Sequence, residues 1–429
     1  MFLRFGYAVA NVGLYGAWAI ILIGHCITIP TAMAVSEIAT NQRVEGGGEY
    51  YIISRSFGLH IGASIGVALF LSQSISVAFY LIAFAESFQP LFDWIHSATG
   101  LRIPDGRFVS VPALLILFLV LYFRGAGTGA AILYGIVLIL FVSLAFFFAG
   151  HPENVPTRIP FQETVTNSDP FFKVFAIVFP AFTGMTAGVG LSGDLKNPRR
   201  SIPVGTMGAT VIGMIVYFLV LYKLAANAPL SELASDQLIM SKISAWGPII
   251  PIGLACATIS SALGSIMVAP RTLQALANDR ILIGDSLNRR LSAISRKTKE
   301  PVNALIVTLA IAMIFVLIGD VDIVAQIITM FFLITYGSLC MISFLEHFAA
   351  DPAYRPSFRS RWWISLLGAL MCFAMMFQIS PLFAGLSALV MSMLYLAIVR
   401  SNPGQSGLTA IFQGAMFQLA RQLQVILQK

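Results

Sequence analysis

Long apolar stretches are the feature of this sequence that most limits its fold. An α-helix needs about 20 apolar residues to cross a bilayer, and eleven stretches come close to or exceed that length. Only 10% of the 429 residues are charged, against roughly 25% in soluble domains, so a water-facing surface cannot cover this chain. The predicted spans are residues 14–36, 59–87, 109–124, 127–149, 171–193, 202–225, 247–269, 302–319, 323–345, 362–379 and 381–399.

The spans predict an all-α polytopic protein of the plasma or inner membrane. Its transmembrane transporter domain covers residues 1–400, with eleven full spans plus a partial first span, because residues 1–10 are apolar but too short to cross. Residues 401–429 are predicted to form a short cytoplasmic amphipathic tail, since their apolar residues recur near helical spacing. This tail would lie on the membrane or on a partner subunit, and a loose C-terminal helix is the alternative.

The basic residues set the orientation of the spans. Lys and Arg gather in alternate loops, and seven of them lie in the loop 271–299. The positive-inside rule places that loop, the loop after span 14–36 and the C-terminal tail in the cytoplasm. The net charge of +7 is therefore a topology signal that requires no nucleic-acid partner. Four cysteines inside apolar runs are interpreted as packing residues: Cys26, Cys256, Cys340 and Cys372.

One predicted span, within residues 171–206, carries a cluster of helix-breaking residues. They fall within eleven positions and are Pro180, Gly184, Gly188 and Gly190. A half-helix ending near Phe182 would present free carbonyls, and a second starting near Met185 would present free amides and a positive dipole end. Discontinuous helices of this kind hold substrates and ions in many transporters. A simple proline kink with glycines for close packing is the alternative.

Few other polar groups lie within the spans. Ser260 and Ser261 are at mid-span, where hydroxyls and helix carbonyls can coordinate sodium; bonding back to the preceding turn is the alternative. Tyr80 and Tyr336 can each offer a hydroxyl to an ion, and the alternative, an interfacial anchor, fits Tyr336 poorly at its depth.

Three ionisable side chains are expected to have structural roles. We expect Glu37 and Glu86, near span ends, to lie at the membrane interface in preference to a proton relay, and His25 to be a buried, satisfied histidine. The sequence contains no P-loop, HExxH or CxxC pattern, so neither an enzyme nor a cofactor is indicated. Transport would then be driven by ion gradients.

Four segments, in order along the chain, resemble the cation–chloride cotransporters of the amino acid–polyamine–organocation superfamily. They are RVEGGGEYYIISRSFG (43–58), FPAFTGMTAGVGLSGDLKNPRRSIPVGT (179–206), SSALGSIMVAPRTLQALANDRIL (260–282) and PAYRPSFRSRWWISLLGALMC (352–372). The resemblance covers nearly the whole chain. It implies two inverted five-helix repeats with a discontinuous sixth span, plus two extra spans, usually paired as a homodimer.

The resemblance also implies three ion sites. Potassium would bind Tyr80, the Pro180 carbonyl and Thr183. Chloride would bind Tyr336 and the amides that follow the threonine, those of Gly184, Met185 and Thr186. Sodium would bind the Ala257 carbonyl with Ser260 and Ser261. The serine pair and Tyr80 together resemble a sodium–potassium–chloride member, which we expect to be prokaryotic.

The resemblance begins just after the break in the family's first span. We therefore expect a truncated first span, with the native start upstream of Met1, and no regulation through the family's large C-terminal domain. The predicted function is symport of chloride with potassium, sodium or both by alternating access. An amino-acid or polyamine permease on the same scaffold is the first alternative. A non-transporting, truncated membrane relative is the second.

Overall fold

The fold is seen in a computed structural model of the 429-residue chain. The structure describes residues 2–41, 50–51, 53–54, 58–100, 105–125, 127–152, 158–185, 195, 197–282, 284–349 and 354–401, together with Met416, Ala420 and Gln424. The predicted ligand Thr186, the second half of the interrupted span and nearly all of the predicted tail lie outside these residues.

Within the described ranges the regular structure is helical, as predicted, and contains no β-strand. The helices, with two 3₁₀ turns labelled η, are η1 (Phe2–Arg4), α1 (Phe5–Asn41), α3 (Leu59–Glu86), α4 (Gln89–Thr99), α5 (Arg107–Arg124), α6 (Gly127–Ala149), α7 (Phe171–Val178), η2 (Phe179–Phe182), α9 (Pro198–Asn227), α10 (Leu230–Ser235), α11 (Ile239–Ile243), α12 (Ile249–Asn278), α13 (Asp285–Leu291), α14 (Val302–Ile318), α15 (Val321–Ala349), α16 (Trp362–Ile379) and α17 (Pro381–Ser401).

Most of these helices fall where the apolar stretches predicted spans. In the described part of the chain, eight helices are long and apolar enough to cross a membrane. Three shorter apolar helices, Tyr134–Ala149, Phe171–Phe182 and Val302–Ile318, occupy the positions of three further predicted spans. Helices such as α5, α9 and α17 leave many large apolar side chains exposed, which suits contact with lipid. The protein is a multi-pass integral membrane protein.

The partial first span and the first full span are joined within α1 by a sharp bend at Gly13. The backbone there has φ 70° and ψ 172°, outside the helical region and in a range where glycine is favoured. A side chain at this position would also lie 2.8 Å from the carbonyl oxygen of Phe161. The bend lets Leu14 and Tyr15 donate backbone hydrogen bonds to Pro160 and Phe161, at 3.0 Å each, before α1 turns into the bundle.

The predicted boundaries and loops need two corrections. The span predicted at 247–269 extends as α12 to Asn278, and the predicted cytoplasmic loop contains the short helix α13, so this loop is more ordered than expected. The loops predicted on the other side contain α4, α10 and α11. These helices have 11 residues or fewer, and such lengths give too little apolar periodicity to stand out in the sequence.

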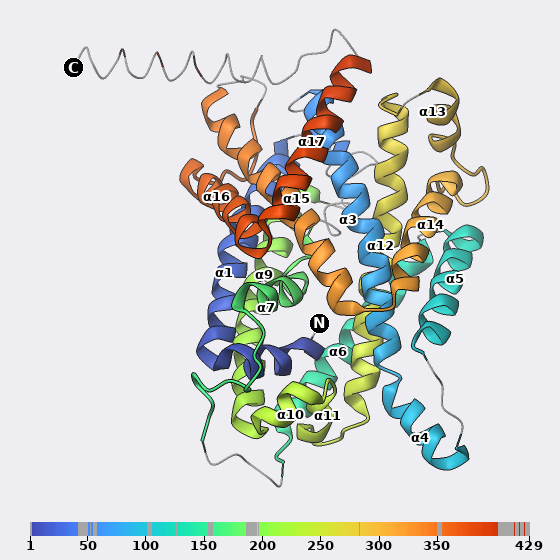
Figure 1. Ribbon diagram of the computed structural model, residues 1–429. Coiled ribbons are helices and arrows are strands. Elements are labelled where there is room, and N and C mark those ends of the chain that lie inside the picture. Colours follow the sequence, from blue (N-terminus) through green and yellow to red (C-terminus); the bar gives the residue numbers. More distant parts are fainter. Residues whose placement is uncertain are drawn as a thin grey trace.

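The long helices form one bundle with two distinct ends (Figure 1). The closest helix pairs include α3 with α12, α1 with α9, and α15 with α16. Helix α13 lies at one end of the bundle, and α4, α10 and α11 lie at the other (Figure 1). Since α13 belongs to the basic loop assigned to the cytoplasm, we call its end the inner end and the other the outer end.

Candidate functional site

The helix that begins with α7 is interrupted where the sequence predicted a break. Regular α-helix ends at Val178, a 3₁₀ turn carries the chain to Phe182, and Thr183 is extended at φ −90° and ψ 178°. Gly184 has φ +111°, which is unfavourable for any residue with a side chain. The half-helix therefore ends at the predicted residue, and backbone groups that a continuous helix would pair become available.

The break is held by its own polar groups. The Thr183 hydroxyl donates to the Pro180 carbonyl at 2.8 Å, and the Thr183 amide points at the same oxygen from 3.4 Å. A carbonyl oxygen has two lone pairs and a hydroxyl oxygen remains an acceptor after donating. The Thr183 hydroxyl oxygen can therefore still accept, whereas the Pro180 oxygen already faces two Thr183 donors and would exchange one of them for the potassium ion that the resemblance predicts.

Two of the predicted ligand tyrosines reach the break from other helices. Tyr80, on α3, is 4% exposed, and its side chain lies beside that of Thr183. Tyr336, on α15, is fully buried, and its hydroxyl oxygen accepts from the Gly184 amide at 3.4 Å. The fold thus gathers residues 80, 180, 183, 184 and 336, which are far apart in the sequence, around one interruption.

A third tyrosine at the break was not anticipated from the sequence. Tyr217, on α9, donates to the Ala181 carbonyl at 2.9 Å and occupies one of the carbonyls freed by the end of the half-helix. Its ring lies 5.5 Å from that of Phe182 and 5.4 Å from that of Phe5. The only available signal was a tyrosine within an otherwise apolar span, and an interfacial anchor gives the same signal.

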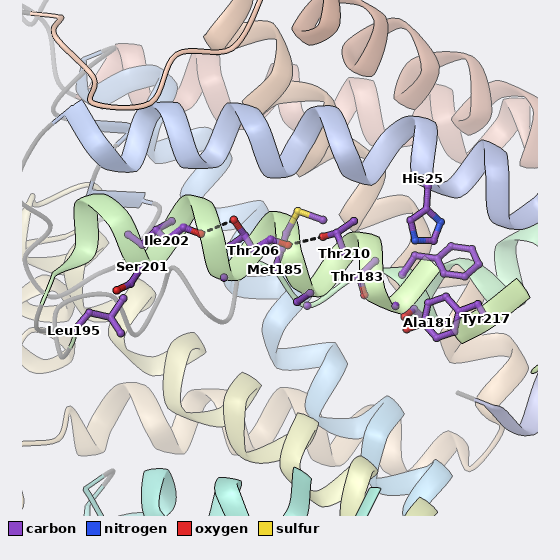
Figure 2. A pocket seen from close by; sticks show the side chains of 15 residues that line it. His25, Ala181, Thr183, Met185, Leu195, Ser201, Ile202, Thr206, Thr210 and Tyr217 are labelled. Carbon is purple, nitrogen blue, oxygen red and sulfur yellow. Dashed lines mark hydrogen bonds between the residues drawn. The ribbon is translucent and has the colours of Figure 1, made fainter. Parts of the chain in front are cut away.

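A cavity of about 490 Å³ adjoins the break. Thr183, Gly184 and Met185 line it on one side, and it is bounded elsewhere by His25 of α1 and by a row of small and hydroxyl residues of α9 that includes Thr206 and Thr210. Figure 2 shows His25 reaching from α1 toward Ala181 and Tyr217 at one end of the cavity. Among the described residues, none would lie within 4 Å of a Cβ atom on Gly184, which lines the cavity.

His25 behaves as a structural histidine, as predicted. Its Nδ1 lies 2.8 Å from the Ile21 carbonyl in the same helix, and its ring is 5.0 Å from that of Phe182. The side chain is 3% exposed. His25 therefore forms part of the cavity wall beside the break.

The predicted sodium ligands lie on α12, and the structure does not join them to the break. The Ser261 hydroxyl donates back to the Ala257 carbonyl at 3.0 Å, which is the bonding pattern considered as the alternative. Ser260 is partly buried beside it. The three groups lie within one helical turn, as a shared ligand set requires, but the hydrogen bonds of the described residues do not link them to another helix.

The outer end of the bundle contains a group of charges around the buried Arg4, which we call the outer cluster: Arg4, Glu86 and Asp322. The Glu86 and Asp322 side chains are 22% and 37% exposed. The Arg4 Nε donates to an Asp322 carboxylate oxygen at 2.6 Å, and its two terminal nitrogens meet the Glu86 carboxylate at 3.1 and 3.4 Å. Arg4 is 7% exposed. Glu86, which was expected at the membrane interface, lies at the end of α3. Its carboxylate ties η1 to α3, and Arg4 also ties η1 to α15.

The inner end contains a second group, which we call the inner cluster: Glu37, Ser343, His347, Ser360 and Ser365. Glu37 is fully buried, and one of its oxygens accepts from the Ser360 hydroxyl at 2.5 Å and the Ser343 hydroxyl at 3.0 Å. Glu37, which was also expected at the interface, is enclosed by protein groups near the end of α1. Its partners are more than 300 positions away, on α15 and before α16.

Helices long enough to span a membrane, around one interrupted helix that faces buried hydroxyls and a cavity, define a polytopic membrane transporter. A family model described as amino acid permease matches residues 1–426. The chain belongs to the amino acid permease family. Because this is a family of permeases, the protein is a transporter and not an enzyme.

Individual relatives support the narrower resemblance. The chain is 31% identical to solute carrier family 12 member 1 of Mus musculus and 30% identical to member 2 of Squalus acanthias, in each case over 94% of its length. It is 29% identical to member 9 of Danio rerio over 90% of its length. These are cation–chloride cotransporters, so the predicted resemblance is confirmed. The chain spans about two fifths of the first two relatives, 41% and 38% of their lengths.

Proposed function

We propose that the protein is a secondary active symporter that couples chloride transport to potassium, sodium or both by alternating access. The observation that carries this proposal is the convergence at the break. Tyr80 meets Thr183, and Tyr336 meets the Gly184 amide, on adjacent residues of one interrupted helix. A cation and an anion could therefore bind side by side.

The two halves of this site suit ions of opposite charge. The Pro180 carbonyl and the Thr183 and Tyr80 hydroxyls present oxygen atoms, which suit potassium. The Gly184 amide and the Tyr336 hydroxyl can present hydrogens, which suit chloride; the 3.4 Å bond between them would open to admit the ion. Adjacent opposite charges stabilise each other, so binding of one ion would favour binding of the other. Met185 and Thr186 belong to the proposed chloride site, and Ala257, Ser260 and Ser261 form the proposed sodium site.

The outer cluster gives this transporter a closed outer end. The buried Arg4 pairs with the partly exposed Glu86 and Asp322, and these ion pairs span three elements of the bundle. In the proposed cycle this ion pair opens when the site faces outward and re-forms when the site faces inward. A homodimer, membrane lipid and inorganic ions are the partners that this function implies.

Uptake of radioactive rubidium, a potassium substitute, into proteoliposomes tests the proposal. With sodium outside, we expect replacement of chloride by gluconate to abolish most of the uptake. Thr183→Ala and Tyr336→Phe should each reduce it several-fold, because each removes one oxygen from the site. Tyr134→Phe is the matched control, since Tyr134 is 84% exposed on α6. Rubidium uptake that is the same with chloride and with gluconate would contradict the proposal. Absence of any ion or solute flux would favour a non-transporting relative.

An amino-acid or polyamine permease is the second candidate. Two observations favour it: the family match and the cavity of about 490 Å³, which is larger than an inorganic ion needs. The free amides of the break would then hold a substrate carboxylate. Competition by unlabelled amino acids and polyamines in the same uptake assay separates the two candidates, because an ion symporter should be unaffected by them.

A further inference from the structure

The inner cluster has a donor and acceptor arrangement that fixes the charge of its histidine. His347, on α15, lies with Nδ1 2.7 Å from the Ser343 carbonyl oxygen and Nε2 2.8 Å from the Ser360 carbonyl oxygen. A carbonyl oxygen can only accept a hydrogen bond. A neutral imidazole has one N–H and one lone pair, so it could satisfy only one of these contacts and would turn its lone pair against the other oxygen. Both ring nitrogens of His347 must therefore carry hydrogens, which makes the ring an imidazolium.

A fully buried carboxylate balances that positive charge. The Glu37 Oε1 lies 3.6 Å from His347 Nε2 and accepts no hydrogen bond within the part of the chain described. The other oxygen, Oε2, accepts from the Ser360 amide at 3.2 Å as well as from the Ser360 and Ser343 hydroxyls. Three donors on one oxygen suit an ionised carboxylate. The two side chains form an ion pair whose positive member exists only while His347 holds its second proton.

Other ionisable groups lie around this pair. Glu346, next to His347 on α15, is 6% exposed. Tyr354, in the segment before α16, interacts with both glutamates and with Arg359. Burial, reinforced by Glu37 and then Glu346, raises the pKa of Tyr354, so that phenol stays neutral throughout the physiological range.

We propose that His347 is a proton-binding site at the inner end of the transporter. The bound proton allows His347, on α15, to form an ion pair with Glu37 of α1 and a hydrogen bond with the segment before α16. The ligand is a proton drawn from the compartment that the inner end faces. An imidazole ordinarily loses its second proton between pH 5 and 8. Contacts that depend on this proton would therefore change within the pH range of a cell.

Loss of this proton has a defined structural consequence. A neutral ring would turn a lone pair toward one of two carbonyl oxygens, and Glu37 would remain buried beside an uncharged partner. The contacts that tie α1, α15 and the segment before α16 together would weaken as pH rises. The site therefore links pH at the inner end to the packing of three elements that meet there. This inference does not depend on which ions or solutes are transported.

The purified full-length protein allows a test without any transport assay. ¹⁵N-histidine NMR of the protein in lipid should show, at pH 6, one ring with both nitrogens protonated that is absent from the His347→Gln variant. The melting temperature of wild-type protein should fall as pH rises from 6 to 9. His347→Gln should flatten that dependence and lower the melting temperature mainly at pH 6, by roughly 2–4 °C.

Two further variants keep the test decisive. His151→Gln is the matched control, because His151 is exposed and only one of its ring nitrogens, Nδ1, faces a carbonyl, that of Ala149 at 2.8 Å. It should retain the wild-type pH dependence. Glu37→Gln should reproduce the flattened dependence of His347→Gln, since it removes the other half of the pair. A neutral ring assigned to His347 at pH 6, or an unchanged pH dependence in His347→Gln, would overturn the proposal.

Discussion

The outer and inner clusters join the same two parts of the molecule by different chemistry. At the outer end Arg4, just before α1, binds Asp322 at the start of α15; at the inner end Glu37, late in α1, faces His347, late in α15. A guanidinium keeps its charge at every physiological pH, whereas an imidazole does not. The cation of the outer cluster therefore keeps its charge at every physiological pH, whereas the proposed ion pair of the inner cluster requires a second proton on His347.

The clusters also differ in how the carboxylates are satisfied. In the outer cluster one arginine serves two carboxylates with three nitrogens, in the forked geometry that suits a guanidinium. In the inner cluster serine hydroxyls and a backbone amide solvate one carboxylate. Loss of the cation should therefore disrupt the outer cluster more, because its carboxylates have fewer neutral donors to fall back on.

Replacement of the outer cation should have the largest effect. We expect Arg4→Ala to lower the free energy of unfolding by about 3 kcal/mol, because it removes the charged hydrogen bonds that a buried guanidinium makes to two carboxylates. The loss should be equal at pH 6 and pH 8, measured by thermal unfolding of the purified protein. Arg4→Lys should recover only part of it, since one ammonium cannot copy the fork.

An exposed ion pair provides the control for that experiment. Lys173 binds Asp169 at 2.7 Å, but the lysine side chain is 47% exposed. Lys173→Ala should therefore cost less than about 1 kcal/mol. If Arg4→Ala costs no more than Lys173→Ala, the outer cluster does not hold the bundle together.

Replacement of the inner carboxylate should have a smaller and pH-dependent effect. We expect Glu37→Gln to cost about 2 kcal/mol at pH 6, where the charged hydrogen bonds and the pairing with His347 are all present. The cost should shrink as pH rises, because the proposed pairing requires a second proton on His347. Thermal unfolding from pH 6 to 9 measures this, with exposed Glu163→Gln as the control. An equal loss at every pH would remove the contrast between the two clusters.

Removal of one hydroxyl should have the smallest effect. Ser360→Ala deletes one of three donors to the same Glu37 oxygen and leaves the Ser360 amide in place. We expect a loss of about 1 kcal/mol, with the pH dependence retained. Ser235→Ala, which removes an exposed hydroxyl bonded to the Ser231 carbonyl, should have almost no effect in the same unfolding assay. A Ser360→Ala variant that lost the pH dependence would show that the serine, and not the histidine, controls the cluster.

The spans and the break could be predicted because their signals are local. Continuous apolar residues identify a helix such as α3, and Pro180 with Gly184 marks the interruption without reference to any other part of the chain. The proposed ligands Tyr80 and Tyr336 could be selected only through the family resemblance. The structure places both at the break, as that resemblance implies.

The two clusters could not be predicted, because each depends on contacts between distant residues. Arg4 and Asp322 are 318 positions apart, and Glu37 and Ser360 are 323 apart. A glutamate near a span end gives the same local signal whether it faces headgroups or a buried arginine. The bend at Gly13, which brings Arg4 into the bundle, is likewise set by close contact with Phe161 rather than by any run of helix-breaking residues.

The central claim, that the break binds a cation and chloride together, is tested most directly by equilibrium binding. Rubidium binding to the purified protein should be measured at fixed sodium, with chloride or with gluconate. We predict that chloride raises the rubidium affinity at least about fivefold, the lower end of common coupling between sites, and that Tyr336→Phe removes this increase. Rubidium affinity that is the same with and without chloride would contradict the claim.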